Sequence, residues 1–132
     1  MSHLEHMALI VDDYDAAIAF FVDALGFELV EDSPALTTKV GRAKRWVVVK
    51  PPGARTGLLL AQADGEHQRA AVGQQFAGRV GLFLRVDDFE GTLARMRAAG
   101  VEILGDPRQE SYGQVVVFRD PFGNKWDLLS GG

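Results

Sequence analysis

The sequence contains no cysteine, which excludes disulfides, thiolate zinc sites and cysteine-based catalysis. It also lacks any run of about 18 apolar residues, so no transmembrane span is expected. The N-terminus does not join a basic segment to an apolar one, so no signal peptide is predicted. Together these absences favour a cytoplasmic protein.

Clustered positive charge is missing as well. The chain has 14 Lys and Arg against 18 Asp and Glu, and only Arg42, Lys44 and Arg45 lie close together. A nucleic-acid surface needs a basic face, so nucleic acid is not an expected partner. Neither a P-loop nor a G-x-G-x-x-G motif after a strand is present, which argues against nucleotide binding. We therefore expect a small molecule as the ligand or substrate, with no membrane partner.

The 132 residues do contain an internal duplication, and their number suits a single domain. Residues 6–29 match residues 81–103. The matched apolar residues are Met7, Leu9 and Val11 with Leu82, Leu84 and Val86, and the matched acids are Asp12 and Asp13 with Asp87 and Asp88. Only two copies fit, which indicates a two-fold repeat and not a solenoid.

Each copy begins with an apolar run of strand length, followed by a helical pattern and a further short strand. An aspartate before each helical pattern, with a second acid three residues later, predicts a capped helix start. These pairs are Asp12 with Asp15 and Asp87 with Glu90. Gly26 and Gly100 are placed to end the two helices, because glycine adopts the left-handed conformation at low cost.

Two more strands complete each copy, at 46–49 and 58–62 and at 115–118 and 125–129. Within each pair, a Pro- and Gly-containing turn predicts a hairpin. The fold class expected is therefore α+β, with two tandem β-α-β-β-β modules. The expected boundaries are 3–62 for module one, 63–79 for a linker that can hold a short helix in its middle, and 80–130 for module two, with a mobile loop over 32–45.

Two motifs carry a resemblance to a known family. "H-x-A-L-x-V-x-D" spans His6 to Asp13, and "D-P-x-G-N-x-x-[DE]-L" spans Asp120 to Leu128. With the repeat, they resemble the vicinal oxygen chelate superfamily, which includes glyoxalase I, extradiol dioxygenases, and fosfomycin- and bleomycin-resistance proteins. The resemblance implies a cup-shaped mixed sheet with helices outside, a site on the concave face, and a homodimer.

The resemblance also implies a divalent metal held by four strand positions, two in each module. Here His6 and Asp127 occupy two of them, while Gly81 and Leu58 replace the other two, or Gly57 if the register slips by one residue. Zn, Ni, Fe or Mn sites normally need at least three protein ligands. The metal site is therefore expected to be degenerate, unless an unaligned residue such as His67 or Glu110 supplies a third ligand.

Candidate site residues follow from strand periodicity and the resemblance. Asp127 shares a strand face with Leu129, and burial would raise its pKa and suit it to acid–base work. Glu110 is a second candidate base. The expected ligand-binding residues are His6, Trp46, Leu58, Phe83, Arg85 and Tyr112. Gly81 beside Phe83 is expected to leave room for a bulky apolar group.

Each candidate also has a structural interpretation. His6 can be an interior imidazole bonded to backbone, Asp127 a solvated strand acid, Arg85 a strand-end residue reaching water, and Tyr112 a loop anchor. We expect a protein that holds a small organic molecule in the cup. The alternatives are a metal-dependent lyase or dioxygenase, a non-catalytic drug- or metabolite-binding protein of the resistance type, and a purely structural or protein-binding module.

Overall fold

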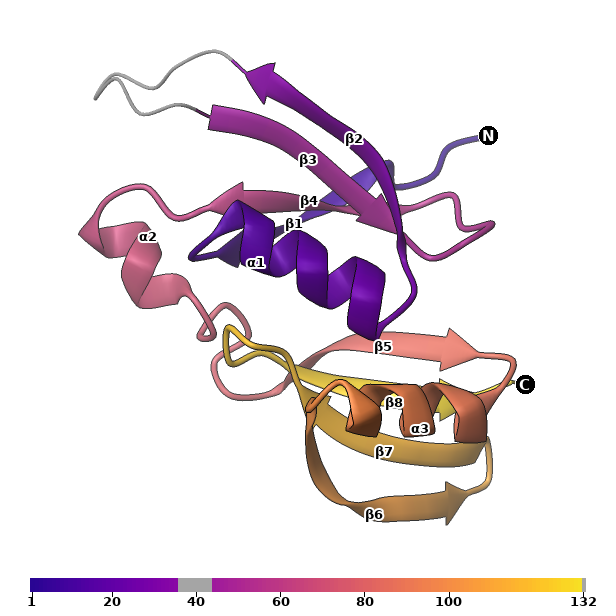
Figure 1. Cartoon of the computed structure of the whole chain (residues 1–132). Coiled ribbons are helices and arrows are strands. Elements are labelled where there is room, and N and C mark those ends of the chain that lie inside the picture. Colours follow the sequence, from indigo (N-terminus) through magenta and orange to yellow (C-terminus); the bar gives the residue numbers. More distant parts are fainter. Residues whose placement is uncertain (36–43, 132) are drawn as a thin grey trace. The chain divides into compact units, whose positions relative to one another are not determined.

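The computed structural model describes residues 1–35 and 44–131. These residues form two compact units, Met1–Ala71 and Val72–Gly132, whose boundary falls inside the segment expected to link the modules. In chain order the elements of the first unit are β1 His6–Val11, α1 Tyr14–Ala19, the π-helix η1 Phe20–Ala24, β2 Glu28–Ala35, β3 Lys44–Lys50, β4 Gly57–Gln62 and α2 Glu66–Ala71 (Figure 1). Those of the second unit are β5 Val80–Val86, α3 Phe89–Ala98, β6 Glu102–Glu110, β7 Gly113–Arg119 and β8 Lys125–Ser130.

Each unit contains one mixed sheet of four strands. The strand order is β1-β4-β3-β2 in the first unit and β5-β8-β7-β6 in the second. In both sheets the first strand pairs in parallel with the last strand of its unit, and the remaining pairs are antiparallel. The predicted α+β class and the two β-α-β-β-β modules are confirmed. The shared cup concerns the placement of the two units and stays a prediction.

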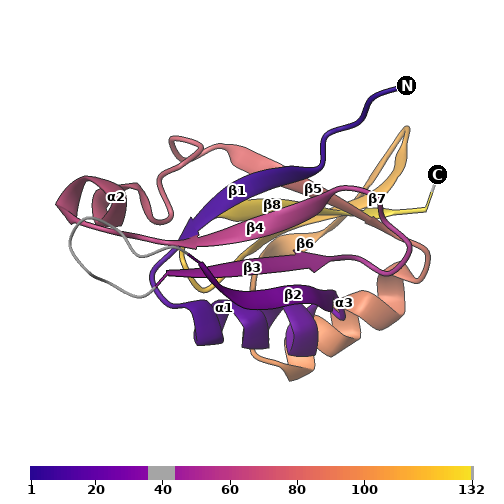
Figure 2. The same ribbon diagram turned by 90° about the horizontal axis from the view of Figure 1, so that it is seen from above.

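One face of each sheet packs against the helix of its own unit. In the first unit α1 runs along one face of the sheet in both views (Figures 1 and 2). Strand alternation sends Leu9 and Val11 to that face, where they are fully buried with Phe21. In the second unit, Leu128 of β8 and Met96 of α3 are buried in the same way. The opposite face of each sheet, which we call the helix-free face, carries the alternate residues.

The helices begin and end where the sequence predicts, within one residue. Asp13, not Asp12, caps α1, because its Oδ2 accepts a hydrogen bond of 2.7 Å from Ala16 N. Likewise Asp88 Oδ1, not Asp87, accepts from Gly91 N at 3.0 Å before α3. The expected caps Asp12 and Asp87 are therefore wrong by one residue, because the aspartate that follows each of them, Asp13 or Asp88, caps the helix.

Glycine ends both helical segments, as expected. Gly26 and Gly100 have φ angles of 74° and 78°, in the region that L side chains avoid. The first helix changes to a π-helix at Phe20, a change that the sequence does not reveal. There the consecutive rings of Phe20 and Phe21 are both buried and meet edge to face at 5.2 Å.

The segment expected to be a mobile loop is strand at both of its ends. β2 extends to Ala35 and β3 starts at Lys44, so the predicted loop over 32–45 is wrong at both ends, and its middle, 36–43, lies outside the described residues. Pro34 misled the sequence interpretation, because β2 is an edge strand, where proline breaks no hydrogen bond of the ladder. The linker does hold a short helix, α2.

No helix in the described part of the chain is long and apolar enough to cross a membrane.

Candidate functional site

The helix-free face of the first unit carries His6 and Trp46. His6 is the first residue of β1, and its side chain lies on the face opposite to that of the buried Leu9. Its imidazole is half-buried. The Trp46 indole meets it edge to face, with ring centroids 6.2 Å apart and planes at 67°. His6 Nδ1 is buried and accepts or donates no hydrogen bond among the described residues. The structural interpretation of His6, an interior imidazole bonded to backbone, therefore does not hold for Nδ1.

The strand beside His6 offers no second ligand at the paired position. His6 pairs with Gly57 on β4, and a Cβ at Gly57 would lie 3.0 Å from Val49 O and 3.1 Å from Val48 Cγ1. These distances leave little room for any side chain there. The residue paired with His6 therefore cannot supply a second ligand.

The register also corrects one predicted ligand-binding residue. Met7 pairs with Leu58 in the first unit, and its repeat partner Leu82 pairs with Trp126 in the second. Leu58 therefore corresponds to Trp126, and Leu59 corresponds to Asp127. Leu58 alternates with Leu59 and shares its face with the fully buried Leu60, on the helix side of the sheet. The prediction that Leu58 replaces the metal-binding acid implied by the resemblance is wrong by one residue, because Leu59 holds that position.

Asp127 lies at the centre of the helix-free face of the second unit. Its neighbours across the ladder are Phe83 on β5 and Val117 on β7, while Trp126 and Leu128 turn into the core. Burial raises the pKa of the half-buried Asp127 carboxyl, and the positive charge of Arg108 acts in the opposite direction. The expected orientation and the expected direction of the pKa shift both agree with this environment.

Phe83 and Arg85 follow each other on the same face. The Phe83 side chain is 63% exposed, which is unusual for a phenylalanine in mid-strand. Arg85 Nη1 donates a hydrogen bond of 2.5 Å to Ser130 O at the end of β8. Arg85 is an exposed residue near the end of β5, as its structural interpretation expects, but its guanidinium also bonds the backbone at the end of β8. Phe83 is an exposed apolar residue of this face.

The space beside Gly81 is filled by the protein itself. An ideal Cβ at Gly81 would overlap three ring carbons of Phe76. Phe76 belongs to the turns that follow α2, in the segment expected to be only a linker. The expectation that Gly81 leaves room for a bulky ligand is therefore wrong, because a side chain of this chain occupies that room. Sequence reasoning missed Phe76, whose one signal is an isolated aromatic in a polar segment.

The two remaining candidates lie at the β6–β7 turn. Glu110 ends strand β6, and its Oε1 accepts a hydrogen bond of 3.1 Å from Arg108 Nε. It belongs to a strand pair and not to a loop, since it pairs with Gly113 on β7. Tyr112 lies in the tight turn between the strands and is half-exposed.

The donor set does not fit a divalent metal. Each unit offers one side chain at the expected strand positions, His6 in the first and Asp127 in the second, and glycine or leucine stands at the others. Among the described residues, no three His, Asp or Glu side chains are gathered so that they could hold a metal ion. His67 on α2 and Glu110, the expected sources of a third ligand, belong to no such group in this part of the chain.

Comparisons with known proteins agree with this architecture. An uncharacterized protein of Shewanella frigidimarina (strain NCIMB 400) is 47% identical over 125 residues, covering 94% of this chain and 90% of that protein. The crystal structure of TnmS3, an antibiotic binding protein from Streptomyces sp. CB03234, matches with a TM-score of 0.78 and 31% identity, covering 100% of this chain and 98% of that one. A glyoxalase/bleomycin resistance protein from the same organism matches with a TM-score of 0.71 and 30% identity, covering 96% and 99%.

The model of one protein family matches residues 3–128, which is nearly the whole chain. The chain therefore belongs to the Glyoxalase/Bleomycin resistance protein/Dioxygenase superfamily.

Proposed function

We propose that this protein binds a small aromatic organic molecule, such as an antibiotic, on the helix-free faces of its sheets and without a tightly held metal. The observation that carries the proposal is the exposure of large aromatic side chains on those faces. Trp46 is 40% exposed and Phe83 is 63% exposed, although the residue that follows each of them, Val47 and Leu84, is buried. Aromatic side chains gain most when a flat apolar partner covers them, and binding sites are rich in them.

Polar groups beside these aromatics supply the orientation that a specific site needs. In the first unit the His6 imidazole touches the Trp46 ring, and its Nδ1 has no hydrogen-bond partner among the described residues. In the second unit the Asp127 carboxyl stands directly across the ladder from Phe83. The similarity to TnmS3, which is an antibiotic binding protein, supports a ligand of this kind.

A metal-dependent lyase or dioxygenase is the second candidate. The half-buried His6, whose Nδ1 has no hydrogen-bond partner among the described residues, favours it, because an imidazole nitrogen is a good metal ligand. The lack of suitable partners for His6 in the described part of its unit weighs against it. Elemental analysis of the purified protein separates the two candidates, since a metalloenzyme would carry roughly one divalent ion per chain.

The binding proposal is tested by titrating planar aromatic antibiotics, with doxorubicin as the first probe, and recording tryptophan quenching and thermal shift. A ligand at a hundredfold excess over Kd stabilises the folded protein by about 2.7 kcal/mol, so even weak binding is measurable. Trp46→Ala and Phe83→Ala are expected to raise Kd by about tenfold, the equivalent of about 1.4 kcal/mol. Thermal shift reports the affinity of the variant that lacks Trp46.

Met7→Ala is the matched control. Met7 is 46% exposed, compared with 40% for Trp46, and it adjoins His6, but alternation places it on the other face of β1. Its replacement should leave Kd unchanged. A panel of aromatic antibiotics that produces neither quenching nor thermal shift would count against the proposal. We further propose that the protein is a homodimer, which light scattering tests as a mass twice the 14.4 kDa of one chain.

A further inference from the structure

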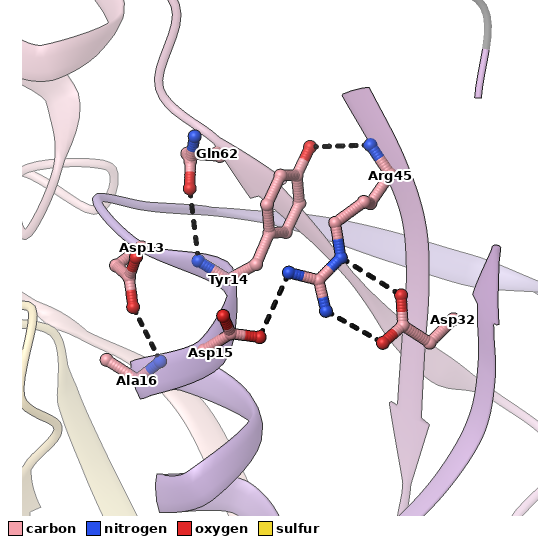
Figure 3. Close-up of polar contacts among 7 residues, drawn as sticks. All are labelled: Asp13, Tyr14, Asp15, Ala16, Asp32, Arg45 and Gln62. Carbon is pink, nitrogen blue, oxygen red and sulfur yellow. Dashed lines mark hydrogen bonds and ion pairs between the residues drawn. The ribbon is translucent and has the colours of Figure 1, made fainter. Parts of the chain in front are cut away.

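The Arg45 side chain joins three elements of the first unit (Figure 3). Its Nε and Nη2 donate to the two carboxylate oxygens of Asp32 on β2, at 3.0 and 2.7 Å. Its Nη1 donates to Asp15 Oδ1 in the first turn of α1, at 2.9 Å. The paired contact to Asp32 is the two-pronged geometry that only a guanidinium can make.

Tyr14 adds two further contacts to this cluster. The Arg45 guanidinium carbon lies 5.0 Å from the centre of the Tyr14 ring, and the Arg45 backbone N–H donates to Tyr14 Oη at 3.2 Å. The Tyr14 backbone N–H in turn donates to Gln62 Oε1 at the end of β4, at 3.1 Å. Both the side chain and the backbone of Arg45 are therefore fixed to the start of α1 (Figure 3).

Trp46 is the next residue on β3. Since successive side chains of a strand point to opposite faces, the contacts that hold Arg45 on the helix side direct Trp46 to the helix-free face. The ring contact between Trp46 and His6 agrees with this placement. The last described pairs of the β2–β3 ladder, Pro34 with Arg45 and Ala35 with Lys44, lie at this end of the strands. The cluster thus fixes the part of β3 that carries the indole.

The cluster around Arg45 is more extensive than an ordinary surface ion pair. Two carboxylates and a phenol converge on one arginine, and two of these three residues also lie at the start of α1. The contact with each carboxylate raises the pKa of Arg45 and the contact with Arg45 lowers the pKa of Asp32, so the charges of the pair are mutually stabilised. These contacts restrain the end of β3 and, with it, the backbone of the residue that follows Arg45.

We propose that Arg45 is a positioning residue that sets the orientation of the Trp46 indole on the helix-free face through its contacts with Asp32, Asp15 and Tyr14. Its effect on affinity rests on the proposed function, whereas its effect on the indole does not. Arg45 itself touches no ligand in this scheme, because its side chain lies on the opposite face of the sheet.

The orientation is tested by ¹⁹F NMR of protein labelled with 5-fluorotryptophan. The chain has 2 tryptophans, Trp46 and Trp126, and a Trp46→Phe variant assigns their signals. Arg45→Gln, Asp32→Asn and Tyr14→Phe should each shift or broaden the Trp46 signal. The Trp126 signal should stay in place, because Trp126 is buried in the core of the second unit, and it reports that this unit is folded. Far-UV circular dichroism checks that the variant keeps the secondary structure of the parent protein.

Glu102→Gln is the matched control for the ion pair. It breaks a pair of the same type, between Arg119 Nη1 and Glu102 Oε2 at 2.8 Å, in the second unit. Its Trp46 signal should be that of the parent protein. A Trp46 signal that keeps its shift and width in both Arg45→Gln and Tyr14→Phe overturns the proposal.

The consequence for affinity is tested with doxorubicin as the probe, using thermal shift. Arg45→Gln is expected to raise Kd by about threefold or more in the parent protein and to have no effect when Trp46 is already alanine, which is the coupling expected of residues acting together. Equal effects in both backgrounds would overturn the link to Trp46. A protein that binds no aromatic probe defeats the proposed function, and the NMR result then decides the positioning role alone.

Discussion

The indole N–H of Trp126 donates a hydrogen bond of 3.0 Å to Oδ2 of Asp120, six residues earlier in the chain. The other carboxylate oxygen of Asp120 accepts from the backbone N–H groups of Phe122 and Asn124, both at 3.0 Å, and the Asn124 amide donates to Oδ2 at 3.1 Å. Asp120 is 3% exposed, so its carboxylate is satisfied almost entirely by the turn that it begins. The motif beginning at Asp120 is thus primarily a turn that fixes the start of β8 and, two residues further, Asp127.

Replacing Asp120 by alanine should therefore be strongly destabilising. It leaves the buried indole N–H and several turn amides without an acceptor, and the expected loss is on the order of 3 kcal/mol. Asp120→Asn, which keeps one acceptor oxygen, should lose less. Urea denaturation of both variants measures the loss, with Asp106→Ala, an exposed residue of β6, as the control. An unchanged urea midpoint in Asp120→Ala would contradict this account of the turn.

The helix caps give a prediction with its control in the adjacent residue. Asp13→Ala removes the side chain that accepts from Ala16 N, and should cost about 1 kcal/mol of stability. Asp12→Ala removes an exposed neighbour that does not cap the helix, and should cost much less. Thermal denaturation compares the two. The same contrast is expected between Asp88 and Asp87, and a larger loss from the first aspartate of either pair would show that the cap is misassigned.

The features that the sequence predicts correctly are those with a local signature. The repeat, the aspartate pairs, Gly26 and Gly100 each act within a few residues of their own position, through hydrogen bonds or backbone conformation. The alternation around Asp127 is equally local, and it places the carboxyl on the helix-free face as expected. For this reason the fold class and the orientation of Asp127 can be deduced from the order of the residues alone.

The features that escape prediction depend on contacts between distant segments. A register error of one residue exchanges Leu58 and Leu59, because superposing two turns does not fix the pairing of their strands. A glycine at position 81 shows that a side chain is missing, but it does not show that Phe76 fills the gap. The role of Arg45 is hidden for the same reason, since Asp15 and Asp32 lie 30 and 13 residues away from it.

The packing of Phe76 on Gly81 gives a prediction for a restored side chain. Gly81→Ala places a methyl group in the space that ring carbons of Phe76 already occupy, and should cost about 1–3 kcal/mol of stability. When Phe76 is also alanine, most of that cost should disappear, because the clash is gone. Chemical denaturation of the single and double variants measures the coupling.

Gly131→Ala is the control for the loss of a glycine. A Cβ at Gly131 would meet its nearest atom at an ordinary 3.5 Å, so this variant should be nearly as stable as the parent protein. Additive effects of Gly81→Ala and Phe76→Ala would mean that the two positions do not share this space. The same clash predicts that Gly81→His does not by itself create a metal ligand.

The raised pKa of Asp127 makes a prediction about the pH dependence of stability. Burial raises the pKa in the folded protein above the unfolded value of 3.8, so ionisation of Asp127 opposes folding. That penalty is fully present above the folded pKa, shrinks as the pH falls through it, and vanishes below 3.8. Asp127→Asn should consequently be more stable than the parent protein at pH 7, and its advantage should decline towards about pH 4.

Urea midpoints of both proteins between about pH 4 and pH 7 test this expectation. Asp106→Asn, which removes a negative charge from an exposed strand position, corrects for the change in net charge. If attraction to Arg108 outweighed burial, the pKa of Asp127 would be lowered and Asp127→Asn would be the less stable protein at pH 7. The sign of the difference therefore shows whether the second unit presents a carboxyl that is easily protonated or one held as an anion beside Phe83.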